Sequence, residues 1–466
     1  MLRVAVIGSG PSGVYTAQSL VEQQAVPDVE VYVLDRLPCP YGLVRYGVAP
    51  DHEKIKSLQN TLRTVLEHPR VHFLGNVAVG APGLSLWELH QIFHAVVFCV
   101  GAATDRHLGV PGEDLPGSHP ATDFVAWYSA HPDAAATRIP LSARSAVVVG
   151  VGNVAVDVAR VLARGAAELA TTDMPQGALG ALADSRIEDV WMVGRRGPSQ
   201  AKFTTKELRE LGALPGAEVH VRPEELARDP AYREAGELPA AIRRNIEVLR
   251  GWAARQGTEA DAGRDPGEAA ARPDAPPVRR IHLRFFLRPV ALLGDAAGVR
   301  AVRFERTAPD GRGQVAGTGE FEDIEAQLVL RSVGYRGMPQ PGLPFDETSG
   351  TVPNVAGRVL REGVPCPGEY VAGWIKRGPT GVIGTNRPCA KETVASLVAD
   401  AEVLAGRAVA EDPVGALHRA GQRPVPWTGW LGIEAAEAAW GHRLGRGTVK
   451  LADWDVLLDA AHRAMD

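Results

Sequence analysis

The sequence is poor in the features that identify several common classes of protein. It has four cysteines in 466 residues (Cys39, Cys99, Cys366 and Cys389), and no two of them form a C-x-x-C pair. This spacing argues against a disulfide framework, a redox dithiol and a cysteine-ligated metal or iron–sulfur site. It predicts reduced thiols in a cytoplasmic protein without a metal site.

Long apolar runs and an excess of basic residues are also missing. No stretch approaches the roughly 18 apolar residues of a membrane-spanning helix. The formal net charge of −5 argues against a general nucleic-acid binder. Because a first strand begins at Leu2, we expect no signal peptide. At 466 residues and 45% hydrophobic composition, the chain can form two or three domains with a substantial core.

Strand-like apolar runs alternate with helical stretches, which is typical of parallel α/β layers. A first helix is predicted at 14–23, and an exposed, mobile loop at Gln256–Pro277, which is rich in Gly, Ala, Pro and charge. The runs predicted as strands are "RVAVIG" from Arg3, "VEVYVLD" ending at Asp35, and residues 71–80, 95–101, 145–150, 190–196, 280–292, 326–337 and 369–378.

The first glycine-rich turn follows the first predicted strand. Gly8, Gly10 and Gly13 match G-x-G-x-x-G between a strand and a helix, and Ser12 lies inside the motif. Such a turn lets the backbone and a helix N-terminus approach a pyrophosphate. Asp35 ends the second strand, where a carboxylate accepts hydrogen bonds from a ribose diol. The alternative is a purely structural turn.

The second glycine-rich turn has the same form and a different ending. Gly150, Gly152 and Ala155 form G-x-G-x-x-A, and the next strand ends in Arg195 and Arg196 instead of an acid. Two guanidinium groups suit the 2′-phosphate of NADP, whereas an acid suits the free ribose of NAD. The first turn therefore predicts FAD and the second NADP. The alternative for the arginines is a solvated surface pair.

A late segment, Glu369–Val398, also has the form of a strand, a glycine-rich turn and a helix beginning near Thr385. In many flavoproteins with two dinucleotide sites, such a helix directs its N-terminus at the flavin ring and stabilises negative charge there. Those proteins often have an aspartate where this chain has Trp374, for which ordinary packing is the alternative.

Taken together, these segments resemble the bacterial form of the adrenodoxin-reductase type of ferredoxin–NADP reductase. The matching stretches run in order from the N-terminus to about residue 398, and the tail beyond is less distinctive. They are "GSGPSG", "PYGLVRYGVAPDHEKIKS", "GVGNVAVDVAR", "VGRRGP", "FTTKELREL", "RSVGYRG", "GLPFDETSGTVPN" and "GWIKRGPTGVIGTN".

The resemblance implies an α/β fold in which an NADP-binding Rossmann-like domain is inserted into a discontinuous FAD-binding domain. We expect the FAD domain at 1–104 and 326–466, the latter with a C-terminal extension, and the NADP domain at 105–325. Two departures are mild: Asp35 stands where the family often has Glu, and Gly13 where it often has Ala.

The resemblance also implies roles for individual residues. FAD contacts would come from Gly13, Asp35, Leu43, Val79, Trp374, Gly381, Val382 and Ile383. NADP contacts would come from Val151, Gly152, Asn153, Val154, Arg195, Arg196, Glu207 and Arg106. His52 and Glu210 match an acid–base pair near the flavin. From the residues alone, His52 would be a helix cap or a surface histidine, and Glu210 a plain exposed charge.

The expected activity is transfer of a hydride from NADPH to FAD, followed by two single-electron transfers to a ferredoxin-type iron–sulfur protein. Arg243, Arg244 and Arg250 lie at helical spacing and would attract an acidic partner, with a solvated helix face as the alternative. The family suggests a monomer.

Other functions remain to be weighed against this one. A thioredoxin-reductase-type enzyme would need a C-x-x-C pair, and a glutamate synthase small subunit would need a cysteine-rich domain for which we expect no room before Leu2. An FAD- and NADPH-dependent monooxygenase, another diaphorase-type flavoprotein and an inactive nucleotide-binding module stay open.

Overall fold

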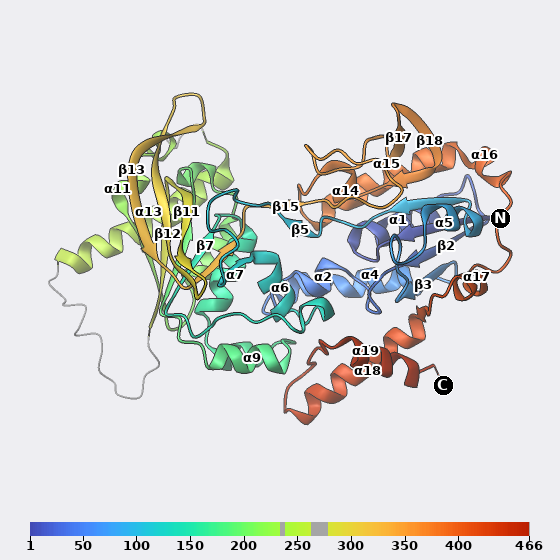
Figure 1. Cartoon of the computed structure of the whole chain (residues 1–466), viewed down its shortest axis with the longest axis horizontal. Coiled ribbons are helices and arrows are strands. Elements are labelled where there is room, and N and C mark those ends of the chain that lie inside the picture. The colour runs from blue at the N-terminus through green and yellow to red at the C-terminus, as the bar shows by residue number, and fades with distance from the viewer. Residues whose placement is uncertain (234–237, 262–277, 466) are drawn as a thin grey trace. The chain divides into compact units, whose positions relative to one another are not determined.

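The computed structural model describes residues 1–233, 238–261 and 278–465 (Figure 1). The chain forms two compact units. The first unit consists of residues 1–104, 129–135 and 334–466, and the second of residues 105–128 and 136–333. The first unit is therefore discontinuous in sequence, and the chain leaves and re-enters it twice.

The second unit ends later in the chain than residue 325, where its end was expected. β14 (Leu328–Arg331) pairs in parallel with β7 and β6, so it is a strand of the second unit, and the chain returns at Gly334. The segment 129–135, expected within the domain 105–325, groups with the first unit. It belongs to the first because the His131 ring packs on Tyr46 at 5.0 Å and Trp454 Nε1 donates to Asp133 at 3.0 Å.

The first unit is built on an eight-stranded sheet with a parallel centre. Its central strands are buried on both faces, which explains their nearly continuous apolar sequence. In spatial order the strands are β16 (Asn354–Val355), β17 (Arg358–Arg361), β18 (Val364–Val371), β4 (Ala95–Phe98), β1 (Leu2–Ile7), β2 (Val29–Leu34), β3 (Val71–Gly75) and β19 (Val425–Pro426).

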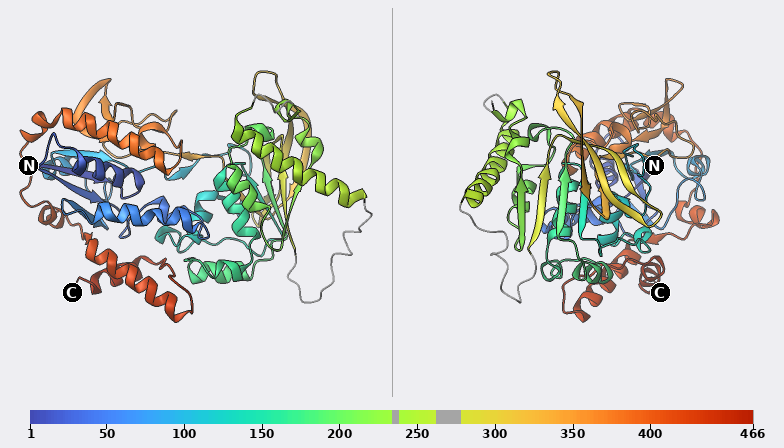
Figure 2. Two further views of the ribbon diagram at one scale, coloured as in Figure 1. Left: turned by 180° about the vertical axis from the view of Figure 1, so that it is seen from behind. Right: turned by 60° about the vertical axis from the view of Figure 1, so that its left-hand side comes forward.

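Helices cover both faces of this sheet. Val4 and Val6 face one apolar cluster and Ala5 and Ile7 the other, as the alternation of a strand requires. The first cluster is closed by α1 (Pro11–Glu22), α4 (Leu58–Leu66), α15 (Asn386–Ala399), α18 (Trp427–Arg443) and α19 (Trp454–Arg463), and the second by α5 (Leu86–Ile92), α14 (Trp374–Arg377) and α17 (Pro413–Arg419). In the left view of Figure 2, α15 in orange and α1 in dark blue lie in front of the sheet.

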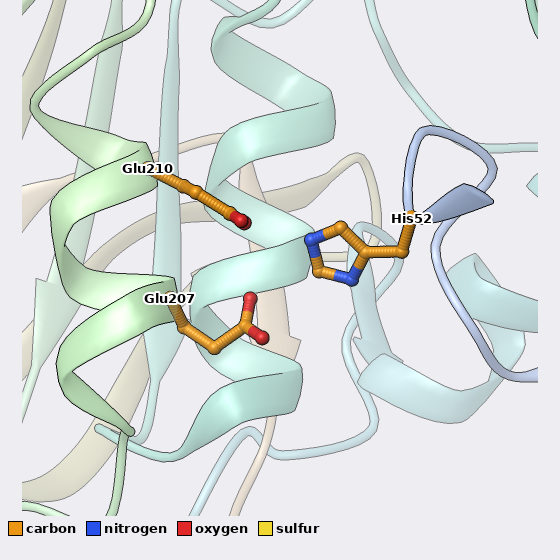
Figure 3. Close-up of side chains that lie close together, drawn as sticks. All are labelled: His52, Glu207 and Glu210. Carbon is orange, nitrogen blue, oxygen red and sulfur yellow. The ribbon is translucent and has the colours of Figure 1, made fainter. Parts of the chain in front are cut away.

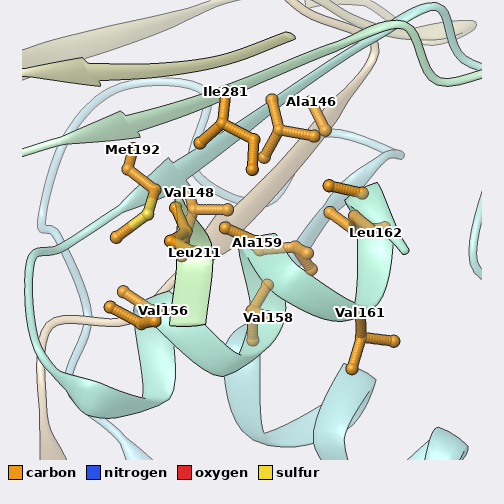
Figure 4. Close-up of a cluster of buried hydrophobic side chains, with 14 of the residues drawn as sticks. Ala146, Val148, Val156, Val158, Ala159, Val161, Leu162, Met192, Leu211 and Ile281 are labelled. Carbon is orange, nitrogen blue, oxygen red and sulfur yellow. The ribbon is translucent and has the colours of Figure 1, made fainter. Parts of the chain in front are cut away.

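The second unit is built on a six-stranded sheet in which every pairing is parallel. In spatial order the strands are β6 (Ser118–Pro120), β14, β7 (Ser145–Val149), β8 (Asp189–Val193), β10 (Arg279–Arg284) and β9 (Ala217–Val221). The helices α7 (Asn153–Ala163), α10 (Thr205–Leu211) and α13 (Ala240–Asp261) share one core with this sheet. Figure 4 shows that core, where Val148, Met192 and Ile281 of the sheet meet Ala159 and Leu162 of α7.

An antiparallel three-stranded sheet packs on the other face of the six-stranded sheet. It consists of β11 (Leu287–Asp295), β12 (Gly298–Pro309) and β13 (Val315–Glu325). Val302 and Phe304 of β12 pack with Val147 and Val149 of β7. This small sheet takes the place that a helix would hold in a parallel sheet covered on both faces.

Several predicted segments differ from the structure, and in two of them a helix stands where a strand or a loop was predicted. In the run 369–378, β18 ends at Val371 and the short helix α14 follows, because Gly373 (φ +78°) turns the chain out of the strand. The predicted loop Gln256–Pro277 is helical up to Asp261, where α13 ends. Residues 262–277 lie outside the described part of the chain.

The remaining elements are short. The helices are α2 (Leu43–Tyr46), α3 (Glu53–Lys56), α6 (Ala121–Tyr128), α8 (Ala166–Leu169), α9 (Gln176–Ala183), α11 (Pro223–Leu226), α12 (Pro230–Arg233) and α16 (Ala401–Ala405). The 3-10 turns in the described residues are η1 (Pro132–Ala134), η2 (Pro198–Gln200) and η4 (Ile383–Thr385). The strands β5 (Thr104–Asp105) and β15 (Tyr335–Arg336) form a two-stranded sheet. Among all the helices in the described residues, none combines the length and the apolarity that crossing a membrane requires.

Candidate functional site

The first glycine turn joins β1 to α1 by a tight backbone path. Gly8 has φ +105°, and a Cβ there would lie 2.7 Å from the carbonyl oxygen of Cys99 in the neighbouring strand segment. Gly10 is the N-cap of α1, and no side chain caps this helix. The first-turn N–H groups therefore keep their hydrogen-bonding capacity for a ligand, which suits an anionic pyrophosphate.

Asp35 braces this turn. Its Oδ2 accepts hydrogen bonds from the backbone N–H of Ser9 (2.8 Å) and from Ser9 Oγ (2.5 Å), and its Oδ1 accepts one from Leu37 N (2.9 Å). Burial raises the pKa of Asp35, and the hydrogen bonds from Ser9 and Leu37 oppose that rise. A carboxylate has about four acceptor positions, so Asp35 retains capacity for a ribose hydroxyl.

The late segment lies against the same turn. A Cβ on Gly373 would be 2.4 Å from Ser12 Oγ, so the stretch that leads into Trp374 contacts the first turn of α1. The Trp374 ring packs on Tyr335 at 5.3 Å, so ordinary packing accounts for part of its role. The helix predicted to begin near Thr385 is α15, which begins at Asn386 and also lacks a side-chain cap.

The other predicted FAD contacts also lie in the first unit. Leu43 begins α2 and is exposed, and Val79 forms an isolated bridge with Leu84. Gly381 and Val382 precede η4, and Val382 is 71% exposed, which leaves its surface available to a ligand. These positions, the glycine turn and the N-terminus of α15 have the chemistry to hold FAD.

The second glycine turn repeats the geometry of the first between β7 and α7. Gly150 has φ +143°, and a Cβ there would lie 2.2 Å from the carbonyl oxygen of Ser332. A Cβ on Gly152, the uncapped N-cap of α7, would meet no described atom within 4 Å. Ala155 is fully buried against the sheet. The open space at Gly152 fits the close approach of a dinucleotide.

Two of the predicted NADP contacts are linked to neighbouring segments. Asn153 Oδ1 accepts a hydrogen bond from Thr204 N at 2.8 Å, which joins the second turn to the start of α10. Val151 O accepts one from Lys202 N at 2.9 Å. Val154 packs on the core of the second unit. These contacts place α10 beside the second turn.

Arg195 and Arg196 follow β8 after Gly194, and hydrogen bonds fix their backbone. Thr307 Oγ1 donates to Arg195 O at 2.8 Å, and Phe286 N donates to Arg196 O at 3.3 Å. Neither guanidinium has a hydrogen bond or ion pair among the described residues. The backbone of the two arginines is therefore fixed, while their guanidinium groups can bind a 2′-phosphate.

Glu207 and Glu210 lie on one face of α10, three residues apart (Figure 3). Thr204 caps this helix by accepting a hydrogen bond from Glu207 N at 3.3 Å. Arg160 of α7 is buried and donates to Glu210 Oε2 at 2.8 Å, and its Nη1 lies 4.0 Å from Glu207 Oε2. An ion pair of this kind favours the ionised form of Glu210.

Arg160 is a residue to which sequence analysis assigned no role. Its guanidinium also pairs with Asp157 at 2.8 Å, so it binds two carboxylates directly. It lies in the matching stretch "GVGNVAVDVAR", as a cation among apolar residues of a helix. A charged side chain on the buried face of a helix is a signal that could have singled it out.

His52 and Arg106 complete the predicted set. His52 is the N-cap residue of α3, and its side chain is buried and makes no capping bond, which removes both simple alternatives for it (Figure 3). Arg106 follows β5, is exposed, and makes no side-chain hydrogen bond or ion pair with the described residues.

The cysteines are structural in character. All four lie in the described residues as free thiols. Burial raises the pKa of Cys39 to about 11 and that of Cys99 to about 12, so both stay protonated at neutral pH.

Comparison with known proteins identifies the family of this chain. A family model described as pyridine nucleotide-disulphide oxidoreductase matches residues 2–192. NADPH-ferredoxin reductase FprA of Mycobacterium tuberculosis is 45% identical, with 98% of each chain covered. The mitochondrial NADPH:adrenodoxin oxidoreductase of Arabidopsis thaliana is 40% identical, with 99% of this chain and 95% of that protein covered. This chain belongs to the adrenodoxin-reductase-type ferredoxin–NADP reductase family.

A solved structure supports the assignment to the reductase family. Mycobacterium tuberculosis FprA in complex with NADPH superposes with a TM-score of 0.88 at 43% identity, covering 99% of each chain. The family resemblance, the α/β fold with parallel sheets and the class of flavoprotein oxidoreductase predicted from the sequence are thereby confirmed. FAD and NADP are the cofactors of this reductase family.

Proposed function

We propose that this reductase-family chain is an NADPH:ferredoxin oxidoreductase that holds FAD in its first unit and NADPH in its second. The observation that carries this proposal is the contrast beside the two glycine turns: Asp35 follows β2, whereas Arg195 and Arg196 follow β8. When bound, FAD accepts the two electrons of a hydride and releases them one at a time.

In the first unit, the uncapped N-terminus of α1 binds the FAD pyrophosphate through its first-turn N–H groups. Asp35 holds the turn through Ser9 and accepts a ribose hydroxyl with its remaining capacity. The N-terminus of α15 stabilises negative charge at the ring, with the Gly381–Ile383 stretch beside it.

In the second unit, the N-terminus of α7 binds the NADP pyrophosphate through the Val151–Val154 stretch. Arg195 and Arg196 bind the 2′-phosphate by charge-assisted hydrogen bonds. Glu207 and Arg106 add contacts to the nucleotide. The proposal thus gives each unit its own dinucleotide.

His52 and Glu210 are proposed to hold and move a proton and to orient the nicotinamide. The ion pair with Arg160 fixes the position of the Glu210 carboxylate. Its charge then favours the protonated form of a nearby base or water.

The partner proposed for the reduced protein is a ferredoxin-type iron–sulfur protein. Arg243 and Arg244 of α13 are exposed. Arg250, seven residues after Arg243 and on the same helix face, packs over the Tyr232 ring at 4.6 Å and donates to the Tyr232 carbonyl. An acidic partner would meet these three cations, most directly the first two.

We also propose that the protein is cytoplasmic and monomeric. The four reduced thiols support the first property, and the pattern of the family suggests the second. Size-exclusion chromatography with light scattering measures the oligomeric state directly.

Steady-state kinetics test the proposed activity. Reduction of ferricyanide, and of cytochrome c through ferredoxin, is measured with NADPH and with NADH. We expect kcat/KM to be at least about 100-fold higher with NADPH, because only its 2′-phosphate meets both arginines. Equal use of NADH would contradict the NADP assignment. A lack of ferredoxin reduction, with stoichiometric oxygen use on an organic substrate, would favour a monooxygenase.

A further inference from the structure

The loop 41–47 forms one wall of the first glycine turn. Tyr41 N donates to Ser9 O at 3.0 Å, and a Cβ on Gly42 would lie 2.8 Å from Gly10 Cα, so the two backbones touch. Leu43, a proposed FAD contact, begins the single-turn helix α2 within this loop. Any shift of the loop therefore changes the space beside Gly10.

The helix α18, near the C-terminus, holds this loop through a buried ion pair. Arg45 Nη2 donates to Glu437 Oε1 at 2.5 Å and Arg45 Nη1 to Glu437 Oε2 at 3.1 Å. The two side chains are 4% and 1% exposed. A pair so completely removed from water is stabilising only while both partners and their geometry are kept.

Two further contacts fix the same loop. Trp430 lies seven residues before Glu437 on the same face of α18, under the Arg45 guanidinium at 5.1 Å and edge-on to Tyr41 at 5.9 Å. Lys450, in the segment after α18, is buried and donates from Nζ to Arg45 O at 2.6 Å.

Glu437 is itself held in place. Its Oε1 accepts a hydrogen bond from Leu451 N at 2.9 Å, and its backbone carbonyl accepts one from Val449 N at 3.2 Å. The carboxylate thus joins α18, the 449–451 segment and the loop 41–47 at one buried point. Surface packing of the C-terminal segment would require none of these bonds.

We propose that Glu437 and Lys450 are positioning residues for the FAD site, which act through Arg45 on the loop 41–47. The C-terminal segment then helps to position the FAD-binding loop, in addition to packing on the core of the first unit. This inference rests on the proposed function in one respect, namely that the first unit binds FAD.

The test is reconstitution of the full-length apoprotein with FAD in the Glu437→Gln variant. Glutamine keeps the shape and removes the charge that pairs with Arg45. We expect the FAD dissociation constant to rise about 10- to 100-fold, with a changed visible circular dichroism of the bound flavin. NADP⁺ affinity, measured by calorimetry, should remain within twofold because that site lies in the other unit.

Glu434→Gln is the matched control. Glu434 lies one turn earlier on α18 and pairs with Arg63 of α4 at 2.9 Å, in an exposed position. Among the described residues it makes no hydrogen bond to the loop 41–47. We expect FAD affinity and flavin dichroism to match the wild type. If Glu437→Gln lowers the melting temperature but gives the same FAD affinity and dichroism as Glu434→Gln, the positioning role is wrong.

Lys450→Met keeps the inference testable if Glu437→Gln does not fold. It removes the bond to Arg45 O and leaves the Arg45–Glu437 pair intact, so we expect a threefold to tenfold loss of FAD affinity. Unchanged affinity in this variant would overturn the role of Lys450. Since these measurements follow FAD alone, a wild type that binds FAD and fails to reduce ferredoxin would overturn the proposed function and not this inference.

Discussion

The two glycine turns share a backbone and differ in the side chains around it. Both begin with a glycine at positive φ pressed against a neighbouring carbonyl, and both lead into a helix with no side-chain cap. Beside the first turn, Asp35 is tied to Ser9 and Leu37. Beside the second, Val151 replaces Ser9, and two uncommitted arginines replace the acid.

This difference shows how the same strand–turn–helix backbone can bind two different dinucleotides. The backbone supplies the anion site that any dinucleotide uses. The side chains after the second strand then distinguish a ribose diol from a 2′-phosphate. Internal hydrogen bonds already hold the first site in place. The two arginine side chains of the second site have no hydrogen-bond or ion-pair partner in the part of the chain that the structure describes. A resident cofactor suits the first arrangement and an exchanging one suits the second.

The largest expected effect comes from blocking each turn separately. Gly8→Ala and Gly150→Ala each force a Cβ into a carbonyl oxygen at positive φ, at a cost of about 3 kcal/mol or more in local strain. We expect Gly8→Ala to weaken FAD binding about 100-fold or more, with NADP⁺ binding kept, and Gly150→Ala to do the reverse. Flavin absorbance and NADP⁺ calorimetry measure the two losses. If either variant lost both ligands with the fold intact, the two sites would not be independent.

Removing both cations of the second site gives the next largest effect. We expect Arg195→Ala combined with Arg196→Ala to raise the KM for NADPH about 100-fold, since hydrogen bonds to charged groups contribute about 1.5–3 kcal/mol each before solvent screening. The KM for NADH should change little, because NADH has no 2′-phosphate. Arg300→Ala, at an exposed ion pair with Asp295, is the control. An equal rise for both nucleotides would refute the assignment.

Loosening the brace of the first site should have a moderate effect. Ser9→Ala removes the hydroxyl donor to Asp35, and we expect a loss of about 1–2 kcal/mol in FAD binding, or roughly tenfold in affinity. Fluorescence titration of the apoprotein with FAD measures this. Val151→Ala alters the matching position of the second turn and should leave FAD affinity unchanged. If the Ser9→Ala variant bound FAD with unchanged affinity, the hydrogen bond from the Ser9 hydroxyl to Asp35 would not be needed for FAD binding.

The smallest effect is expected at the surface. Arg243→Ala touches neither turn, so both cofactors should bind normally and ferricyanide reduction should be unchanged. We expect kcat/KM with ferredoxin to fall about threefold to tenfold at low salt and to approach the wild-type value at high salt, where such attraction is screened. A salt-independent loss, or a loss with ferricyanide as well, would place the defect elsewhere.

Sequence analysis located the parts of the molecule whose signals are local. The strand–turn–helix of each glycine motif, the acid or arginines after the second strand, and the helix beginning near Thr385 are all recognisable from neighbouring residues. The boundary between the units was harder to predict. The apolar sequence of β14 would suit a buried strand of either unit, and only its pairing with β7 assigns it to the second.

By itself, therefore, the sequence determined the family, the two dinucleotide motifs and their different chemistry, since each depends on residues close together in the chain. Only the tertiary structure decided that Arg160 holds Glu210, that the late segment contacts the first turn of α1, and that Glu437 reaches Arg45. These contacts join residues 50, 361 and 392 positions apart. No local pattern encodes them, because a buried charge acquires its partner only when the elements that carry both have packed.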